Sequence, residues 1–390
     1  MNPILHVTEK EHIYKQLFKL KPLLKQDFST SAVAPFIGRF GYPDIFVGVL
    51  SPSQSSEDAY LSDAPRSWAK ECYTSHQVVD LRYSLINSRF KSNIYSSERI
   101  LNIAREAGMA MRPFDVDIHL KREPKMVFSL HNFSAPTGPK GELQDAKITE
   151  NPKVSSKVEK VVGDDDWKAN DAIIYLHKKG FEENFLTRLM SVGNIGIKPD
   201  RKLVPTMWSI TAVDDMVGKS LISSIRDFQQ GGFQAYFGGY MGNYFLILTL
   251  PGIWSYELFE ITVGQGPLQY STDHESYLGR RQYADETQGG YYACRLAITE
   301  RLHQQKRQNS VLALRFITPE YTLPLGVWVV REAARNSLKS TPFEFSDQPS
   351  LFAYARSIAS KYNINLDDFL KRSVLLNERR VQTDLASFFL

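Results

Sequence analysis

The sequence predicts an α+β fold, with a mixed or antiparallel sheet core, surrounding helices and a flexible C-terminal tail. Segments with strand character and segments with helical periodicity follow one another without the strict alternation of a doubly wound fold. Gly-Gly and Gly-Asn pairs interrupt an aromatic and β-branched stretch over residues 233–261, which is typical of antiparallel hairpins. An apolar cluster closes the chain after the charged run Glu378-Arg379-Arg380, which indicates a tail outside the core.

Residues 1–150 are expected to form an N-terminal α/β region. Apolar spacing on one face predicts helices there, and short alternating or β-branched runs predict strands. A Ser-, Pro- and Asp-rich segment predicts a surface loop. The expected elements are a helix over 8–27, a strand over 44–50, a loop over 51–65, helical structure over 75–108, and strands over 115–121 and 125–131.

Residues 151–381 are expected to form the main α+β core, and residues 382–390 the tail. The polar stretch 132–163 has weak periodicity and reads as a domain boundary or a long functional loop. The expected elements that follow are helices over 166–179 and 181–190, hairpin strands over 202–211 and 233–261, a helix over 291–308, strands over 311–317 and 325–330, a helix over 331–340, and two short helices within 350–376, the second capped by Asn365.

Composition and charge exclude several classes of protein. A net charge of +4 over 390 residues gives only a small mean field, so an argument for DNA binding needs local clusters of charge. The longest apolar run, Tyr244–Trp254, is too short to span a bilayer, so we expect no membrane partner. The N-terminus shows no secretory signal, and the two cysteines, Cys72 and Cys294, suit a reducing compartment. The expected location is the cytoplasm.

The last nine residues carry the sharpest signal in the sequence. Gln382, Leu385, Phe388 and Phe389 follow the spacing Gln-x-x-aliphatic-x-x-Phe-Phe. One helical or 3₁₀ turn would bring the leucine and the two rings to one side, as an apolar plug for a pocket on a partner. This pattern resembles the PIP-type motif by which replication and repair proteins dock on the DNA sliding clamp, PCNA. The alternative is that the Phe pair folds back onto the protein's own core.

The rest of the chain resembles the Nre family of archaeal DNA-repair proteins over nearly its whole length. The segments that carry the resemblance occur in order and are long and unusual in sequence. They are IGRFGYPDIFVGVLSP (37–52), LVPTMWSITAVDDMVG (203–218), PGIWSYELFE (251–260), GRRQYADETQGGYYACRLAITE (279–300) and LPLGVWVVREAAR (323–335).

The resemblance implies a cytoplasmic DNA-repair protein that is recruited to the sliding clamp, and it implies no particular reaction. Relatives typically carry an N-terminal four-cysteine zinc segment, but this chain has no cysteine before Cys72, so no zinc is expected. Met207 is a second departure, because a basic residue is expected before Trp208.

The segment 279–307 is the expected binding site for nucleic-acid phosphate. Arginines that suit phosphate alternate there with tyrosines that suit base stacking, and Gly289-Gly290 would let backbone amides approach an anion. The alternative is a helix whose tyrosines pack in the core and whose arginines are solvated. The candidate binding residues are Arg280, Arg281, Tyr291, Tyr292 and Arg295.

Carboxylates offer a second hypothesis, a catalytic site holding a divalent metal ion. Acidic side chains gather beside apolar or Gly-rich segments, and oxygen ligands suit Mg²⁺ or Mn²⁺ in phosphodiester cleavage. Surface carboxylates or partners of nearby arginines are the alternative. The candidate residues are Asp214, Asp215, Asp273 and Glu275, with the first two expected near a helix N-terminus.

These observations together predict a DNA-repair protein whose tail docks on the sliding clamp and whose core binds DNA or a nucleotide. Two alternatives stay open: a metal-dependent phosphodiesterase or nuclease that acts on damaged DNA or nucleotides, and a non-catalytic repair adaptor. A shared concave pocket for the carboxylates and the Arg/Tyr residues would favour the enzyme.

Overall fold

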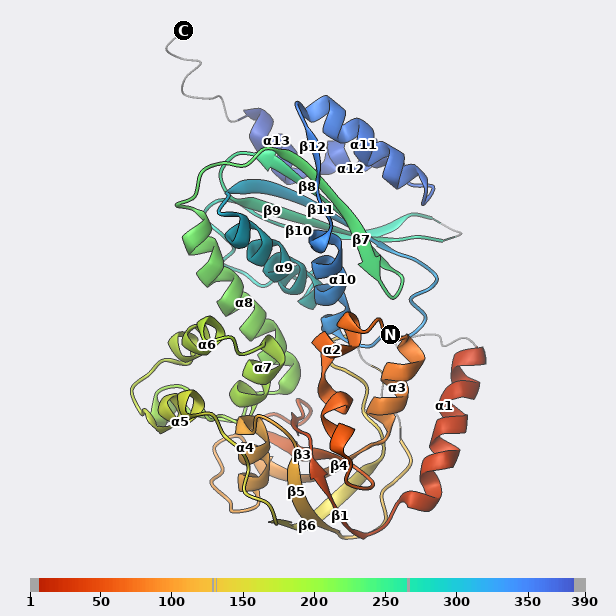
Figure 1. The fold of residues 1–390 in the computed structure, drawn as a ribbon, viewed down its shortest axis with the longest axis vertical. Coiled ribbons are helices and arrows are strands. Elements are labelled where there is room, and N and C mark those ends of the chain that lie inside the picture. The colour runs from red at the N-terminus through yellow and green to blue at the C-terminus, as the bar shows by residue number, and fades with distance from the viewer. Residues whose placement is uncertain (1–6, 128–129, 131, 265–266, 382–390) are drawn as a thin grey trace. The chain divides into compact units, whose positions relative to one another are not determined.

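The computed structural model describes residues 7–127, 130, 132–264 and 267–381 (Figure 1). Its contacts divide the chain into two compact units. Unit 1 comprises residues 1–217 and 322–328, and unit 2 comprises residues 218–321 and 329–390. The division falls inside one helix, between Val217 and Gly218, whereas the sequence analysis sets its boundary at residue 150.

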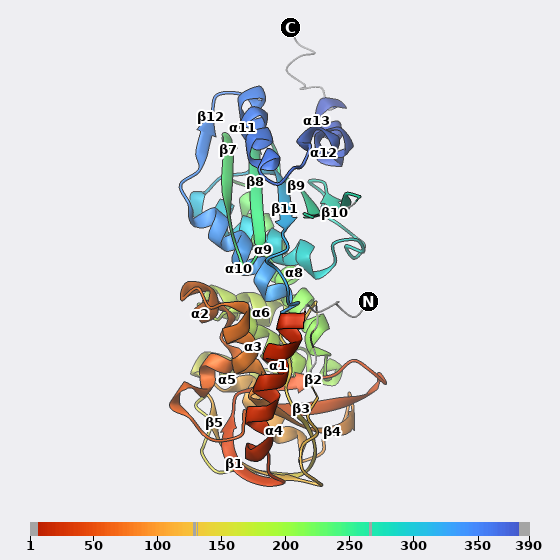
Figure 2. The same ribbon diagram turned by 90° about the vertical axis from the view of Figure 1, so that its right-hand side faces the viewer.

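Unit 1 is built on a six-stranded sheet in the order β1-β5-β6-β4-β3-β2, in which β4 and β6 are parallel and the other neighbours antiparallel. Figure 2 shows α1 beside α3 in this unit. The elements are α1 (Val7–Leu20), η1 (Lys21–Leu23), β1 (Asp27–Ala32), β2 (Ala34–Ile37), β3 (Asp44–Pro52), η2 (Glu57–Asp63), α2 (Pro65–Lys70), α3 (Ser75–Tyr83), β4 (Leu85–Asn93), α4 (Leu101–Met109), β5 (Phe114–Leu120), β6 (Lys140–Ile148), α5 (Ser156–Gly163), α6 (Ala169–Lys178), α7 (Glu183–Ser191), η3 (Lys198–Asp200) and the first part of α8 (Thr206–Ile225).

One face of this sheet supplies an extended apolar core cluster of unit 1. Ile45, Val47 and Val49 alternate along β3 and pack in one cluster with residues of α4 such as Leu101 and Ala104. Alternation sends the intervening side chains, that of Phe46 among them, to the opposite face. That opposite face carries the candidate site described below.

Unit 2 is built on a second six-stranded sheet, in the order β10-β9-β11-β8-β7-β12, in which β9 and β11 are parallel. Leu246, Leu314 and Phe259 from its strands pack against residues of α11, α12 and α13 in one apolar cluster. The elements are β7 (Phe233–Tyr240), β8 (Asn243–Pro251), β9 (Ser255–Thr262), β10 (Gln269–Glu275), α9 (Gly289–Gln305), β11 (Asn309–Ile317), α10 (Val327–Lys339), β12 (Phe343–Phe345), α11 (Gln348–Ser360), α12 (Leu366–Arg372) and α13 (Val374–Val381).

The predicted α+β class is confirmed by these two mixed sheets with their helices. The predicted strands over 44–50 and 311–317 are β3 and β11, and the helix predicted over 291–308 is α9. The Asn365 cap is also confirmed, because its Oδ1 accepts the backbone N–H of Asp367 at 3.3 Å. No helix in the described part of the chain has the length and apolar character needed to cross a bilayer.

Four local predictions are wrong, because tertiary context overrides local pattern. The helical stretch predicted over 75–108 contains β4, whose alternating side chains pair with β3. The expected boundary or loop over 132–163 contains β6 and α5. The stretches 202–211 and 325–330 are predicted strands, but α8 begins at Thr206 and α10 at Val327. In addition, Asp214 and Asp215 lie inside α8 rather than near a helix start.

Candidate nucleic-acid interface

The arginines predicted to bind phosphate differ in their surroundings. Arg280 is half-buried and forms an ion pair with Asp273 at 2.9 Å, while it donates to the carbonyls of His274 and Tyr283 at 2.8 and 3.0 Å. Arg281 is exposed. The contacts of Arg280 therefore stabilise the local loop. Of the two arginines, Arg281 is the more exposed to solvent.

The other three predicted residues lie in the interior of unit 2. Tyr291 is fully buried and Tyr292 is 6% exposed. Arg295 is 1% exposed and forms an ion pair with Glu275 at 2.8 Å. Burial, ahead of the repulsion from Glu275, raises the pKa of Tyr291 well above its ordinary value. The packing alternative weighed in the sequence analysis describes the two tyrosines, but it expects solvated arginines, and Arg295 is buried.

The candidate metal-binding carboxylates have protein partners. One oxygen of Asp273 accepts both the N–H and the hydroxyl of Thr287 at 2.8 Å, and Glu275 accepts the indole N–H of Trp254 at 3.0 Å. Asp214 is fully buried and belongs with Asp215 to unit 1, whereas the other two belong to unit 2. The described residues hold no group of three or more His, Cys, Asp or Glu side chains that could bind a metal ion. The divalent-metal site stays a prediction.

The clamp-docking residues Gln382, Leu385, Phe388 and Phe389 lie outside the described residues. The helix directly before them, α13, is firmly attached to the second sheet. Glu257 of β9 accepts the hydroxyl of Ser373 at 2.5 Å and the N–H groups of Val374 and Leu375 at 3.0 and 3.1 Å. Burial raises the pKa of Glu257, although these hydrogen bonds act in the opposite direction.

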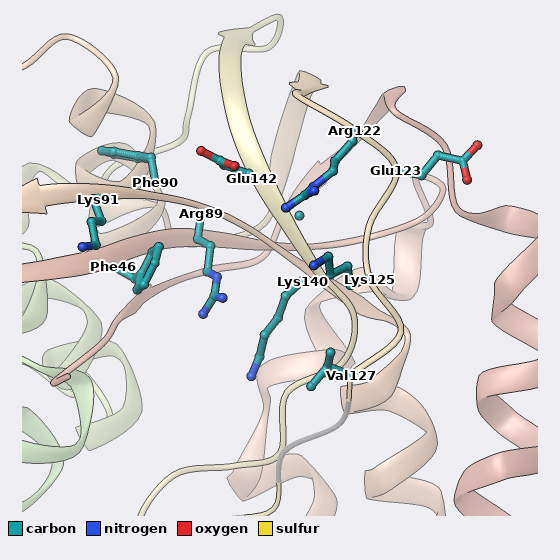
Figure 3. Close-up of a pocket in the computed structure, with 11 residues that line it drawn as sticks. Phe46, Arg89, Phe90, Lys91, Arg122, Glu123, Lys125, Val127, Lys140 and Glu142 are labelled. Carbon is teal, nitrogen blue, oxygen red and sulfur yellow. The ribbon is translucent and has the colours of Figure 1, made fainter. Parts of the chain in front are cut away.

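The polar face of the sheet in unit 1 carries a pocket with a strongly basic lining and a volume of about 410 Å³ (Figure 3). We call it the basic pocket. Strands β3, β4 and β6 and the segment before β6 supply its walls. None of the predicted site residues lies in it. Its lining residues are Phe46, Arg89, Phe90, Lys91, Arg122, Glu123, Lys125, Val127, Lys140, Gly141 and Glu142.

Sheet register explains why these cations share one face. Phe46 of β3 pairs with Lys91 of β4, and Arg89 pairs with Glu142 of β6, so side chains at these positions point the same way. Lys140 lies on the same face, two residues before Glu142. Figure 3 shows the Arg89 guanidinium and the Lys140 ammonium directed into the same space, beside the Phe46 ring.

The charge in the basic pocket is poorly compensated. Glu142 pairs at 2.5 Å with Lys121, which lies outside the lining. Arg89 and Lys140 form no ion pair with any residue in the described part of the chain. Partial burial lowers the pKa of both, and the charge of Arg89 lowers that of Lys140 further. These half-buried cations therefore lack an anion among the described residues.

The aromatic ring of Phe46 completes the arrangement. The Arg89 guanidinium lies 4.3 Å from its centroid and the Lys91 ammonium 6.0 Å. A guanidinium on a ring keeps its N–H groups free at the edge, where they can grip a phosphate through two parallel hydrogen bonds. The chemistry of the basic pocket thus suits a phosphate-bearing ligand.

Sequence reasoning misses this pocket for two reasons. Arg89 and Lys91 lie on β4, within the stretch predicted to be helical, and Lys140 lies in the stretch predicted to be a boundary or loop. The period-two pattern Asn87-Arg89-Lys91, with Ser88 and Phe90 between, could have indicated a strand with one basic face.

Comparison with protein families covers nearly the whole chain. The family model "Archaeal Nre, N-terminal" matches residues 3–267, and "Archaeal Nre, C-terminal" matches residues 275–388. The chain belongs to the archaeal Nre family. No solved structure matches this member of the family significantly.

Curated Nre relatives have closely similar lengths. DNA repair protein NreA of Haloferax volcanii is 31% identical over 97% of this chain and 93% of its own. NreA of Archaeoglobus fulgidus is 33% identical over 91% of this chain and 88% of its own. DNA repair protein NreB of the same organism is 30% identical over 91% and 90%. The Nre resemblance stated from the sequence is confirmed.

Proposed function

We propose that this protein acts in DNA repair by binding the phosphates of DNA in the basic pocket while residues 382–390 dock on the sliding clamp. The names of the curated Nre relatives support the role in repair. The single observation that carries the DNA contact is the pair of half-buried cations, Arg89 and Lys140, that lack an ion-pair partner among the described residues. A DNA phosphate would supply the negative charge that these two cations lack among the described residues.

Anion binding at this position is physically favourable. Half-buried cations interact more strongly with an anion than solvated ones do, because the local dielectric is lower. Five basic side chains line the basic pocket against two acidic ones, and Lys121 neutralises one of these acids. The excess charge suits a ligand with more than one phosphate, such as a polynucleotide backbone.

The clamp contact rests on a separate argument from sequence. The spacing of Gln382, Leu385, Phe388 and Phe389 matches the docking pattern described above. Attachment of α13 to Glu257 supports the proposal, because the motif then begins directly after a fixed helix. Burying two phenylalanines and a leucine in a partner's pocket supplies roughly 1.5–3 kcal/mol each, less the cost of ordering the segment.

Charge-removing variants test the DNA contact. We expect Arg89→Gln/Lys140→Gln to weaken binding of DNA and to reduce the slope of log affinity against log salt by roughly 0.7–0.9 for each phosphate that the protein no longer neutralises. Lys19→Gln, an exposed lysine on α1, is the matched control. An unchanged affinity and an unchanged slope in the double variant would refute binding at the basic pocket.

A further inference from the structure

The loop between β2 and β3 presents aromatic rings to solvent beside the basic pocket. Phe40, at the tip of this loop, is 77% exposed and Tyr42 is 42% exposed. The guanidinium of Arg39 lies 4.9 Å from the centroid of the Phe40 ring. Large apolar side chains exposed in this way, with a cation at the ring, are typical of a binding surface.

Trp208 of α8 adds a third ring to this surface. It is 45% exposed, and its ring centroid lies 5.3 Å from that of Tyr42. The hydroxyl of Thr206 accepts the N–H of Ile37 at 3.0 Å, which holds the start of α8 against the end of β2. The two family-typical segments 37–52 and 203–218 therefore meet here.

Backbone geometry fixes the loop that carries Phe40 and Tyr42. Gly41 has a φ of +85°, and a Cβ there would lie 2.7 Å from the carbonyl oxygen of Asp44. The N–H of Asp44 donates to the carbonyl of Gly41 at 2.9 Å, and that of Gly38 donates to Phe46 at 2.8 Å. Only glycine fits at position 41 without strain. The rings are held in place before any ligand arrives.

The aromatic surface is continuous with the basic pocket. An adjoining pocket of about 140 Å³ shares Phe46, Arg89 and Lys140 with it. This adjoining pocket also takes in Arg39 and Phe40 from the loop. Its complete lining is Phe36, Ile37, Gly38, Arg39, Phe40, Phe46, Arg89, Ser134, Ala135, Thr137, Lys140 and Met207. Arg39, Phe40, Phe46, Arg89 and Lys140 thus line two joined pockets of unit 1, and Trp208 directly follows the lining residue Met207.

A fully buried amide lies on the same sheet face, although it lines neither pocket. Asn87 is fully buried, and neither its amide nitrogen nor its amide oxygen has a hydrogen-bond partner in the described part of the chain. It precedes Arg89 by two residues on β4, so both side chains leave the strand on one face. A buried amide without partners costs free energy unless a ligand or water satisfies it.

We propose that this surface binds a single strand of DNA, with phosphates on Arg89 and Lys140 and with unpaired bases stacked on Phe40 and on the Tyr42–Trp208 pair. Paired bases in a duplex stack on each other and offer no ring faces to the protein, whereas unpaired bases do. The inference rests on the proposed DNA contact and adds the class of DNA. Charge favours a polyanion over an apolar protein segment as the occupant.

Fluorescence anisotropy with the full-length protein shows whether the surface prefers single-stranded DNA, duplex DNA or another polyanion. The probes are a labelled single strand of about 20 nucleotides, the matching duplex and poly-glutamate. We expect tighter binding of the single strand than of the duplex, and a loss of about 5- to 100-fold in single-strand affinity for Phe40→Ala/Trp208→Ala. Phe18→Ala is the control, because Phe18 on α1 is 81% exposed and lies in neither pocket.

The outcomes distinguish this inference from the proposed function. Equal affinity for both DNA forms, with no effect of the aromatic substitutions, overturns the single-strand inference while the charge variants still test the DNA contact. Poly-glutamate binding as tightly as the single strand also overturns it. Trp208→Phe, which keeps a stacking face, is expected to retain most of the affinity that Trp208→Ala loses. A loss of equal size in both variants would contradict stacking.

Discussion

Lys140 of β6 and Arg89 of β4 extend into the same pocket, and their repulsion contributes to the lowered pKa of Lys140. Burial is the larger cause. Two half-buried like charges do not stabilise a protein, since each one raises the free energy of keeping the other charged. The arrangement becomes favourable when an anion lies between them, and on this relationship the account of DNA binding depends.

The first prediction separates stability from binding at Lys140. Lys140→Met removes a charge that repels Arg89 and keeps the apolar stem of the side chain. We expect the free protein to melt at the same temperature or higher, and its affinity for single-stranded DNA to fall about tenfold or more. Thermal melts and anisotropy measure the two effects. A variant that melts at a lower temperature and binds DNA normally would give Lys140 a structural role instead.

The second prediction concerns pH. In the proposed site the cationic form of Lys140 holds the phosphate, and the pKa of Lys140 lies below the ordinary value because of burial and the nearby charge of Arg89. Affinity for DNA should therefore decline as pH rises through that lowered pKa, at lower pH than for an exposed lysine. Titration between roughly pH 7 and 10 measures this decline. Lys140→Arg, charged throughout that range, should flatten the profile, and an unchanged profile would exclude Lys140 as its source.

The third prediction concerns the attachment of α13. Glu257→Ala removes the acceptor of two backbone N–H groups, and we expect a loss of about 1–3 kcal/mol in the free energy of unfolding. Urea unfolding measures it. Glu378→Ala is the control, since Glu378 is half exposed and its ion pair with His274 is long, at 3.3 Å. Equal stability of the two variants would contradict the capping role of Glu257.

The raised pKa of Glu257 also fixes the sign of its pH dependence. The folded protein takes up this proton at higher pH than the unfolded chain does, because burial penalises the carboxylate. As pH falls from above the raised pKa toward the ordinary value, Glu257 therefore contributes a gain in stability, complete once the pH is below the unfolded value. Mild acid is not expected to release α13 through this residue.

The fourth prediction concerns the clamp motif. Phe388→Ala/Phe389→Ala should weaken binding to the sliding clamp by about 30-fold or more, since loss of a central anchor costs ~2 kcal/mol or more. Calorimetry with the purified clamp measures it. DNA binding by the same variant should stay at its original value. Undiminished clamp affinity would remove the proposed recruitment and leave the DNA contact standing.

The fifth prediction concerns the buried pair Arg295 and Glu275 in unit 2. Arg295→Met leaves Glu275 buried beside Trp254 without its cation, and we expect a loss of about 3–5 kcal/mol in stability. The fraction of the Arg295→Met protein that folds should bind DNA with the affinity of the unsubstituted protein. Weakened DNA binding in a fully folded Arg295→Met protein would favour the phosphate-binding role expected from the sequence.

Some features of the fold can be predicted from the sequence, and others cannot. The α+β class, β3 and the Asn365 cap follow from local patterns, because short-range sterics and hydrogen bonds decide them. The basic pocket does not, since Lys140 joins Arg89 and Lys91 only through the parallel pairing of β4 with β6. Pairing between strands so distant in sequence leaves no local signal.

The segment 279–307 shows that a pattern in the sequence can also indicate a site where the structure has a buried helix. Its composition suits nucleic acid, but the same tyrosines and arginines also suit a buried helix, and Tyr291 and Arg295 are in the core. Composition alone could not separate a nucleic-acid site from a buried helix. Whether the tyrosines and arginines of α9 are buried depends on their packing against β9 and β10. In contrast, the loop residues 38–43 stand out in the sequence only for their family likeness, and the exposed ring of Phe40 lines the adjoining pocket.

Photo-cross-linking tests the central claim most directly. A single strand carrying photoreactive thymine analogues is bound to the full-length protein and irradiated, and the cross-linked residues are located by mass spectrometry. The account predicts attachment at Phe40, Tyr42, Phe46 or Trp208, and its loss when Arg89 and Lys140 are both replaced by glutamine. Cross-links confined to residues 279–307, with none in unit 1, would contradict it.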